Sequence, residues 1–526
     1  MLNARSIQSS IVLIIGLLLA VVMGNMLVTD TFSAFAWLGV VAVITICIFM
    51  GRRIWLLIPF MGALELGLRI PGQPSSLMLG ELLTLAFCTV LFLMRKLPLK
   101  LVWTELEFWM LVLTLFVVQA YIRNPVGVNI FGGDTVGGKP YFLFGMATVS
   151  AMVLAGLQVT APELMMIIRV SIVGGLLNAF VSLLSTFVPA VGSYFSGSFA
   201  TSEEVTYENF NRVIDTGATN RITFLGSLTR NVALWVCSFI SPVKALLDPF
   251  WGSLLLFTVL GAAYSGYRNA VVTVGSTYLV GLAYRGGFGY LMLAALGGTG
   301  AVAMLAAVNL MAPLPPNIQR SLTFLPGTWE QRYRDDAKGS SEWRYEIWQE
   351  VLTSDKYIQN KWMGDGLGFS SDAFRQSVAM ADTNGTGVSG FDVQRENILV
   401  SGDYHSGPVQ TIRVIGYIGL LFLLLAMARL AIHAHRQILR CRGTEWYPLA
   451  LFTGIPLITY PFFFAFVFGD FQGGATTFML GAAMVRMLQN NLPLPAYAGR
   501  SRSPYLLATR KDSPQPAAAF SSERAG

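Results

Sequence analysis

Long apolar runs separated by short polar connections dominate this chain. A helix that crosses a bilayer needs about 20 mostly apolar residues, and fourteen runs approach that length. Twelve is an equally consistent number, because the short runs at 54–69 and 250–284 are also compatible with re-entrant segments. The pattern predicts an all-α polytopic membrane protein with 12–14 transmembrane helices. The runs lie near 11–29, 34–50, 54–69, 77–94, 106–122, 141–158, 164–188, 226–244, 250–266, 268–284, 289–311, 412–432, 447–468 and 474–490.

One long polar segment, residues 312–411, interrupts the apolar pattern. It separates a first membrane part with about eleven helices, residues 1–311, from a second with about three, residues 412–490. The remaining residues, 491–526, are rich in Pro, Ser, Ala and Arg, a composition that predicts a disordered tail. The chain is therefore expected to have four parts, of which the polar segment is the one large extramembrane loop.

Apolar spacing also predicts structure inside this loop. Ser341 is expected to cap a helix with an apolar stripe formed by Trp343, Ile347, Val351 and Leu352. A tight glycine turn follows at 363–368, and then a short helical stretch at 372–380. The glycine-rich residues 384–390 are expected to be mobile and to form a flap. These elements together are sufficient to roof a cavity at the membrane surface.

Composition and charge support the membrane assignment. Apolar residues make up 54% of the chain and charged residues only 12%, against roughly 25% charged residues in soluble domains. Basic residues recur at alternate ends of the runs, for example at Arg52, Lys96, Lys244 and Arg285. By the positive-inside rule both termini are expected in the cytoplasm and 312–411 on the outer face of a bacterial inner membrane. The net charge of +7 therefore reflects cytoplasmic rims and predicts no nucleic-acid partner.

The most informative single residue is His405, one of only three histidines. It stands at the end of the polar loop, directly before the run 412–432, while His433 and His435 follow that run in a basic cluster. An imidazole at the membrane surface is a candidate general base, because histidine titrates near neutral pH. If residues 406–408 begin the helix, the positive end of its dipole favours the neutral ring. The alternative is a histidine that only forms hydrogen bonds at the interface.

Three motifs carry a resemblance to a known family. The segment 405–419, His-Ser-Gly-Pro-Val-Gln-(x5)-Gly-Tyr-Ile-Gly, is similar to a His-Asn element that leads into a glycine-containing helix. Residues 265–270, Ser-Gly-Tyr-Arg-Asn-Ala, resemble a Ser-x-Ser-Arg-Gly element. Residues 344–348, Arg-Tyr-Glu-Ile-Trp, followed by the glycine turn, resemble an Arg-x(3)-Trp and Gly-x-Gly stretch. In this order the motifs resemble the O-antigen ligase and polysaccharide polymerase superfamily of membrane glycosyltransferases. Ser406 and Asn269 depart from the family pattern, which has Asn and Gly there.

The resemblance implies a GT-C-like fold and a defined reaction. The donor would be a glycan on undecaprenyl pyrophosphate, and the acceptor would be lipid A-core, another lipid-linked glycan or a protein. Such a reaction needs a base for the acceptor hydroxyl, the role of His405, and positive charge for the departing pyrophosphate. No cofactor is implied. No metal is expected either, because the only adjacent acidic pairs outside the membrane, 203–204 and 335–336, are not placed as in related metal-dependent enzymes.

Arginines near the outer membrane edge are the candidates for binding the pyrophosphate. Arg268 is expected at the outer end of a span, and Arg344 lies on the predicted loop helix. Guanidinium groups suit bidentate contacts to phosphate. Arg221 and Arg413 are weaker candidates, and Arg230 is better explained as a residue whose charged head reaches the interface.

A transporter or flippase of lipid-linked sugars is the alternative from another functional class. Many transporters consist of two similar halves with charged residues near the middle of the membrane. This chain has no recognisable internal repeat, and its longest polar insertion lies in the second half only. The sequence therefore favours a glycosyltransferase over a transporter.

Overall fold

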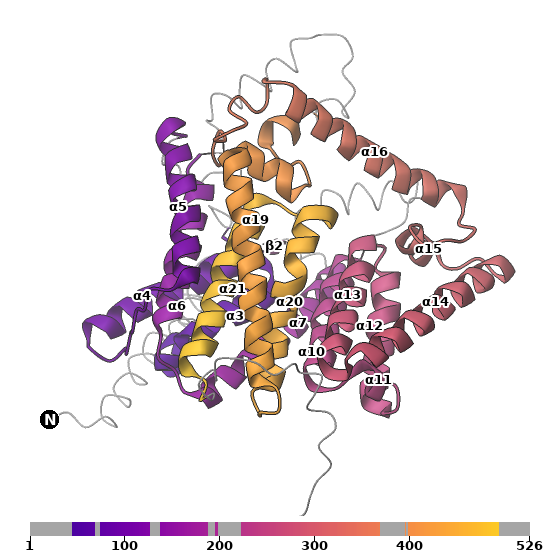
Figure 1. Ribbon diagram of the computed structural model, residues 1–526, viewed down its shortest axis with the longest axis horizontal. Helices are drawn as coiled ribbons and strands as arrows, with labels where there is room; N and C mark the ends of the chain where they lie inside the picture. Colours follow the sequence, from indigo (N-terminus) through magenta and orange to yellow (C-terminus); the bar gives the residue numbers. More distant parts are fainter. Residues whose placement is uncertain are drawn as a thin grey trace, which may run out of the picture. The chain divides into compact units, whose positions relative to one another are not determined.

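The computed structural model describes residues 45–68, 74–126, 137–187, 195–197, 222–368, 395 and 398–493. The predicted run 11–29, most of the run 34–50, the stretches 372–380 and 384–390, and nearly all of the tail lie outside these residues. The described chain is mostly helical, as predicted (Figure 1).

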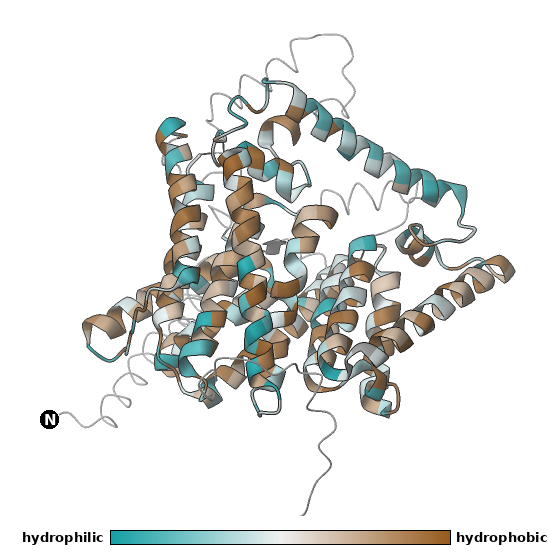
Figure 2. Cartoon of the chain, viewed as in Figure 1, coloured by the Kyte–Doolittle hydropathy of each residue, from teal (hydrophilic) through white to brown (hydrophobic). Residues whose placement is uncertain are grey.

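Eight helices in the described part of the chain are long and apolar enough to cross a membrane, which confirms a multi-pass membrane protein. Hydrophobic residues predominate along most of these helices (Figure 2). The eight are Thr45–Leu64, which includes η1 (Gly51–Leu56) and α3 (Leu57–Leu64), α4 (Ser76–Leu93), α5 (Glu105–Arg123), α6 (Lys139–Gly156), α7 (Ala161–Phe187), α14 (Phe288–Met311), α19 (Gly407–Cys441), and α20 (Tyr447–Phe462) with its continuation η2 (Phe463–Val467).

Four more predicted runs are helical, but they are shorter or less apolar than these eight. They are α10 (Thr223–Phe239), α12 (Pro249–Tyr264), α13 (Arg268–Gly286) and α21 (Phe471–Asn491). α10 packs against α12 and α13, and α21 packs against α6 and α19. The smaller elements are α11 (Pro242–Ala245), α15 (Pro316–Leu322), α16 (Gln331–Thr353) and an antiparallel pairing of β1 (Leu66–Leu68) with β2 (Phe195–Gly197).

The loop helix α16 is longer than the sequence pattern predicts. It begins at Gln331, so Ser341 lies inside the helix, where its hydroxyl donates to the Ala337 carbonyl instead of capping a terminus. The predicted apolar stripe is confirmed: Ile347 and Val351 are buried in a cluster with the 399–412 segment. The N-terminal part of α16 is mainly hydrophilic (Figure 2), which explains why its start could not be recognised from apolar spacing.

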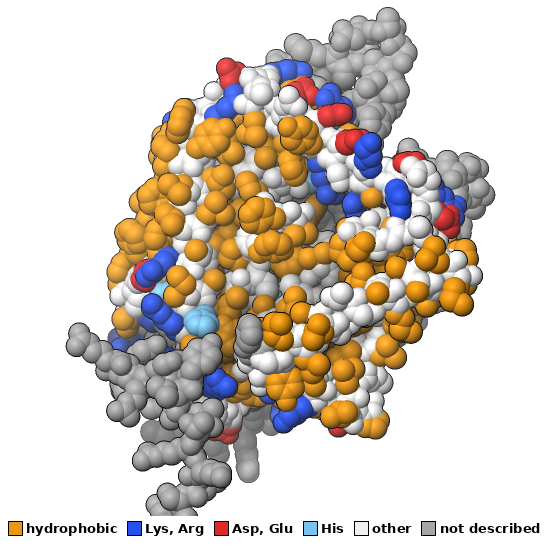
Figure 3. Space-filling view, turned by 45° about the vertical axis from the view of Figure 1, so that its right-hand side comes forward, with side chains coloured by type: hydrophobic (Ala, Val, Ile, Leu, Met, Phe, Trp, Pro, Cys, Tyr) orange, Lys and Arg blue, Asp and Glu red, His pale blue; other side chains and the backbone are white. Residues whose placement is uncertain are grey.

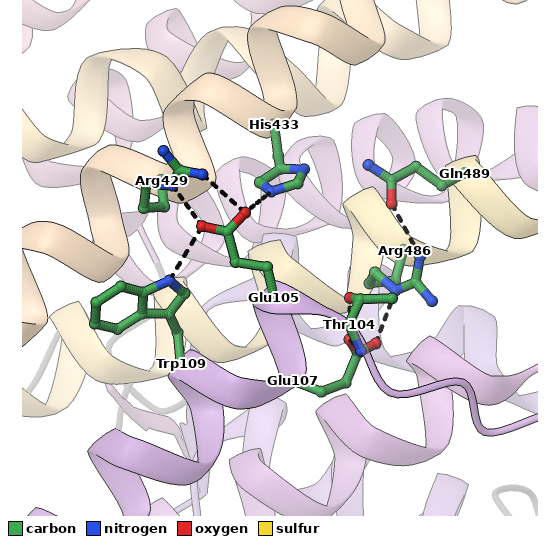
Figure 4. Close-up of polar contacts among 8 residues, drawn as sticks. All are labelled: Thr104, Glu105, Glu107, Trp109, Arg429, His433, Arg486 and Gln489. Carbon is green, nitrogen blue, oxygen red and sulfur yellow. Dashed lines mark hydrogen bonds and ion pairs between the residues drawn. The ribbon is translucent and has the colours of Figure 1, made fainter. Parts of the chain in front are cut away.

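α19 also extends beyond the predicted run 412–432, at both ends. His433 and His435, expected to follow the span, lie inside this helix. His433 Nε2 lies 3.1 Å from a carboxylate oxygen of Glu105 on α5, and Arg429 donates to the same carboxylate (Figure 4). These partners explain how α19 continues through polar residues that end the apolar run in the sequence.

A second polar link joins α5 to α21. Glu107 accepts a hydrogen bond of 2.7 Å from Arg486 Nε, and both side chains are buried, with exposed fractions of 5% and 7% (Figure 4). The same carboxylate accepts from the backbone N–H of Thr104 and so caps α5. A buried ion pair of this kind is costly to break, because the partner left behind is a desolvated charge.

The most unusual feature of α19 is a break at Gly416, where φ is 76° and ψ is 178°. The loop residues 361–366 occupy the break. The backbone N–H groups of Asp365 and Gly366 donate to the Arg413 and Val414 carbonyls, and those of 417 and 418 donate to the carbonyls of 361 and 362. Backbone groups freed by a broken membrane helix must find such partners. The predicted glycine turn is thus the segment that docks into the helix that follows His405.

Candidate functional site

His405 is held at the beginning of α19 by a rigid backbone. Ser406 is the N-cap residue and its hydroxyl accepts a hydrogen bond from Val409 N at 3.4 Å. The preceding Tyr404 is buried, and its carbonyl accepts a 2.8 Å hydrogen bond from the indole N–H of Trp348 on α16. His405 itself has a φ of 51°, a left-handed conformation that is uncommon for residues other than glycine. The surrounding contacts therefore fix an uncommon backbone conformation at the predicted base.

The imidazole lies between aromatic rings and beside a carboxylate. Its centroid is 5.7 Å from that of Phe468, nearly parallel, and 6.1 Å from that of Trp343. Nδ1 is 3.4 Å from Asp403 Oδ1, although the pair lacks hydrogen-bond geometry. Such contacts are often loose before substrate binds. Asp403 is thus placed to orient the imidazole, and the side chain of His405 keeps 30% of its surface exposed.

Asp470 is a second acid of this site that the sequence reasoning missed. It is the N-cap residue of α21 and accepts from the backbone N–H of Gly473. Burial raises the pKa of Asp470, the Gly473 hydrogen bond opposes this rise, and the negative charge of Asp403 adds to it. Asp470 also interacts electrostatically with His405. The available signal was an acidic residue in the short connection between the runs 447–468 and 474–490.

The structure brings the two leading arginine candidates together. Arg268 is the first residue of α13, Arg344 lies in the middle of α16, and both are half-buried. Burial, and then the positive charge of Arg268, hold the pKa of Arg344 below its usual range. Nε of Arg344 is buried and has no hydrogen-bond partner among the described residues. Arg268 and Arg344 are thus close enough to interact electrostatically, and a buried donor without a described partner is suited to an anion.

α16 links this arginine pair to the histidine. Arg344 directly follows Trp343, the residue whose ring contacts His405. Figure 3 shows Lys and Arg side chains interspersed with Asp and Glu along the upper right of a face that is otherwise mainly hydrophobic, and further Lys and Arg at its lower left. Trp343 therefore connects the candidate base to α16, the helix that carries Arg344.

Arg320 is a further residue that the sequence reasoning missed. It is buried on α15, donates to Asp336 Oδ2 at 2.8 Å, and donates to the Gly266 carbonyl at 3.2 Å. It also interacts electrostatically with Arg268. Asp336, from the acidic pair 335–336, thus anchors α16 over the start of α13, while Asp335 accepts a hydrogen bond from Gln331. In the sequence, Arg320 could have been noticed as the first basic residue after the prolines at 313–316 that end the preceding span.

The two weaker candidates have different outcomes. Arg221 lies outside the described residues. Arg413 is buried with an exposed fraction of 8%, and its Nη2 donates to the Val400 carbonyl at 3.2 Å. A Cβ added at Gly402 would come within 2.5 Å of Arg413 Nη1. The guanidinium group of Arg413 therefore contacts residues 400–402, which precede α19.

Comparison with known proteins gives no match, either among family models or among curated proteins. The chemistry of the site is thus the basis for assigning a function. It combines an imidazole next to a carboxylate, an aromatic platform, and two guanidinium groups that interact electrostatically.

Proposed function

We propose that this protein is a membrane glycosyltransferase that moves a glycan from a polyprenyl pyrophosphate, undecaprenyl pyrophosphate in bacteria, to an acceptor hydroxyl on the outer face of the inner membrane. The observation that carries the proposal is the partnerless buried Nε of Arg344, next to Arg268, on the helix whose Trp343 contacts His405. A base and an anion site side by side are what a displacement with an anionic leaving group needs.

In this reaction the acceptor oxygen forms a bond to the anomeric carbon, and the bond between that carbon and the pyrophosphate oxygen breaks. The pyrophosphate leaves with the bonding electron pair, and Arg268 and Arg344 stabilise the charge that develops on it. The proton of the acceptor hydroxyl passes to His405, whose imidazole is oriented by Asp403 at 3.4 Å. The two guanidinium groups provide the positive charge, so the proposal assigns no metal.

The acceptor remains one of three kinds: lipid A-core, as in a ligase, another lipid-linked glycan, as in a polymerase, or a protein. All three acceptors present a hydroxyl or amide nucleophile to the same donor. The residues described above, which act on the donor and on the nucleophile, would therefore be the same for each acceptor. A flippase of lipid-linked sugars has no use for a base next to an anion site at one end of the helices.

The test is loss of the imidazole in the full-length protein. We expect His405→Ala to lower glycan transfer from a reconstituted polyprenyl-pyrophosphate donor by about a hundred- to ten-thousand-fold, the usual contribution of a general base. His435→Ala is the matched control, because this histidine contacts Tyr284 near the other end of α19 and should retain activity. Normal transfer by well-inserted His405→Ala protein would remove His405 from the mechanism.

A second experiment, in cells, distinguishes an enzyme from a transporter by the leaflet on which the lipid-linked substrate accumulates. A strain that lacks the enzyme should accumulate its lipid-linked substrate on the outer leaflet, where transfer is blocked. Accumulation on the inner leaflet would instead support the transporter.

A further inference from the structure

A cavity of about 140 Å³ lies between α10 and α13, next to the proposed pyrophosphate site but separate from it. Arg268 is not among its lining residues, whereas Asn269, the next residue of α13, is. The cavity is lined mainly by polar side chains, namely Thr223, Ser227, Arg230, Tyr267 and Asn269. Nothing in the proposed mechanism uses these residues.

Two of the side chains that line the cavity, Arg230 and Asn269, offer hydrogen-bond donors, whereas the Thr223 and Tyr267 hydroxyls bond each other and the Ser227 hydroxyl donates to Glu65. Arg230 uses Nη2 to donate to Ser227 Oγ at 3.0 Å, which leaves its Nε and Nη1 groups without a partner among the described residues. Asn269 accepts from Thr273 through its carbonyl oxygen at 3.0 Å, which leaves its amide N–H groups available. None of the described residues that line the cavity is Asp or Glu. A ligand that accepts hydrogen bonds and carries negative charge fits this lining.

The nearest described acid does not neutralise Arg230 effectively. Glu65 Oε1 is 3.9 Å from Arg230 Nη2, and its other carboxylate oxygen accepts from the Ser227 hydroxyl. Both charged side chains are partly exposed, so their mutual attraction is weak. Arg230, which the sequence suggested reaches the interface, also lines this polar cavity and is the only cation among its described lining residues.

The backbone adds to the positive potential of the cavity. Thr223 and Asn269 stand in the first turns of α10 and α13, and neither helix has a side-chain cap. The N-terminal ends of both helices therefore border the same cavity, and the positive ends of their dipoles add to its potential. This contribution supports the Arg230 side chain, which is the main source of charge.

We propose that this cavity binds the oxyanion of a second substrate, so that the protein holds two anionic groups on neighbouring residues of α13. The proposal rests on the proposed function, in which Arg268 and Arg344 hold the donor pyrophosphate. The oxyanion is either a phosphate of a lipid-linked acceptor or the carboxylate of an acidic sugar, and both present the same acceptor oxygens to Arg230 and Asn269.

The experiment measures anion binding to the full-length protein in lipid nanodiscs, with inorganic pyrophosphate as the probe in calorimetry. We expect two sites in the unaltered protein. Arg230→Gln should weaken one of them at least tenfold, and Arg344→Gln should weaken the other. Arg53→Gln is the matched control, since Arg53 is an exposed arginine that pairs with Glu163 at 3.1 Å. Two unchanged sites in Arg230→Gln protein would overturn the proposal.

A labelling experiment tests the same cavity without relying on stoichiometry. A maleimide should modify Ser227→Cys, and an anion in the cavity should slow the modification at least tenfold. Slowing by pyrophosphate but not by glucuronate identifies a phosphate ligand, and slowing by glucuronate but not by glucose identifies a carboxylate. Labelling that none of these anions slows would overturn the proposal. Failure of this inference leaves the effect of His405→Ala on transfer intact, whereas failure of the proposed function leaves the cavity's anion binding intact.

Discussion

Replacing Gly416 tests whether the break in α19 depends on glycine. With φ at 76° and ψ at 178°, this residue occupies a region open essentially to glycine alone, and other residues there cost about 1–3 kcal/mol. A Cβ would also lie 2.1 Å from the Trp362 carbonyl oxygen and 2.4 Å from Met363 N. Both are backbone atoms, so the docked loop itself would have to move.

The size of the effect follows from the hydrogen bonds that hold the loop. Four backbone hydrogen bonds join residues 361–366 to α19, and each contributes about 1 kcal/mol net. If Gly416→Ala expels the loop, docking weakens by about 4 kcal/mol, which is about a thousandfold in the docking equilibrium. Glycan transfer should decrease as well, because the first segment of α19, which follows His405, would lose the hydrogen bonds to the docked loop.

Hydrogen exchange detected by mass spectrometry measures this directly. In Gly416→Ala protein the amides of 365, 366, 417 and 418 should exchange about a thousandfold faster, in line with the lost docking energy. Gly275→Ala on α13 is the matched control, because nothing lies within 4 Å of a Cβ at that position. Exchange within twofold of the unaltered protein would refute the view that a glycine is required at the break.

Three other sets of substitutions have defined outcomes. Arg268→Lys and Arg344→Lys should each lose most transfer activity and weaken donor binding, because lysine keeps the charge but not the paired donors; full activity in both would contradict the pyrophosphate assignment. Glu107→Gln and Arg486→Gln should each lower the free energy of unfolding, followed in detergent, by about 3–5 kcal/mol. The double substitution should lower it by less than the sum of the two single effects. Additive effects would show that the two residues are not coupled. Asp403→Asn should lower kcat with little change in KM. The decrease should be smaller than the hundred- to ten-thousand-fold expected for loss of the base itself. A normal kcat in Asp403→Glu protein would support an orienting role for this carboxylate, and an unchanged kcat in Asp403→Asn protein would exclude that role.

The sequence alone predicted where most helices lie, because membrane spans are specified by local apolar length. The predicted runs from 77–94 to 164–188 each coincide within a few residues with α4 to α7. The pattern also predicted the buried stripe with Ile347 and Val351, which depends on helical spacing alone. Helix ends were less accurate wherever polar residues continue a helix: α16 begins ten residues before Ser341, and α19 runs on past His433.

Only the tertiary structure decided how distant residues combine. Arg268 and Arg344 were chosen separately, and their proximity depends on α16 passing over the start of α13, where the Arg320–Asp336 pair anchors it. The glycine turn and the helix after His405 could both be recognised in the sequence, but not the docking of one into a break in the other. Local patterns report burial and helix length because these depend on near neighbours. The pairing of charges and of freed backbone groups depends on residues tens to hundreds of positions apart, which no local pattern encodes.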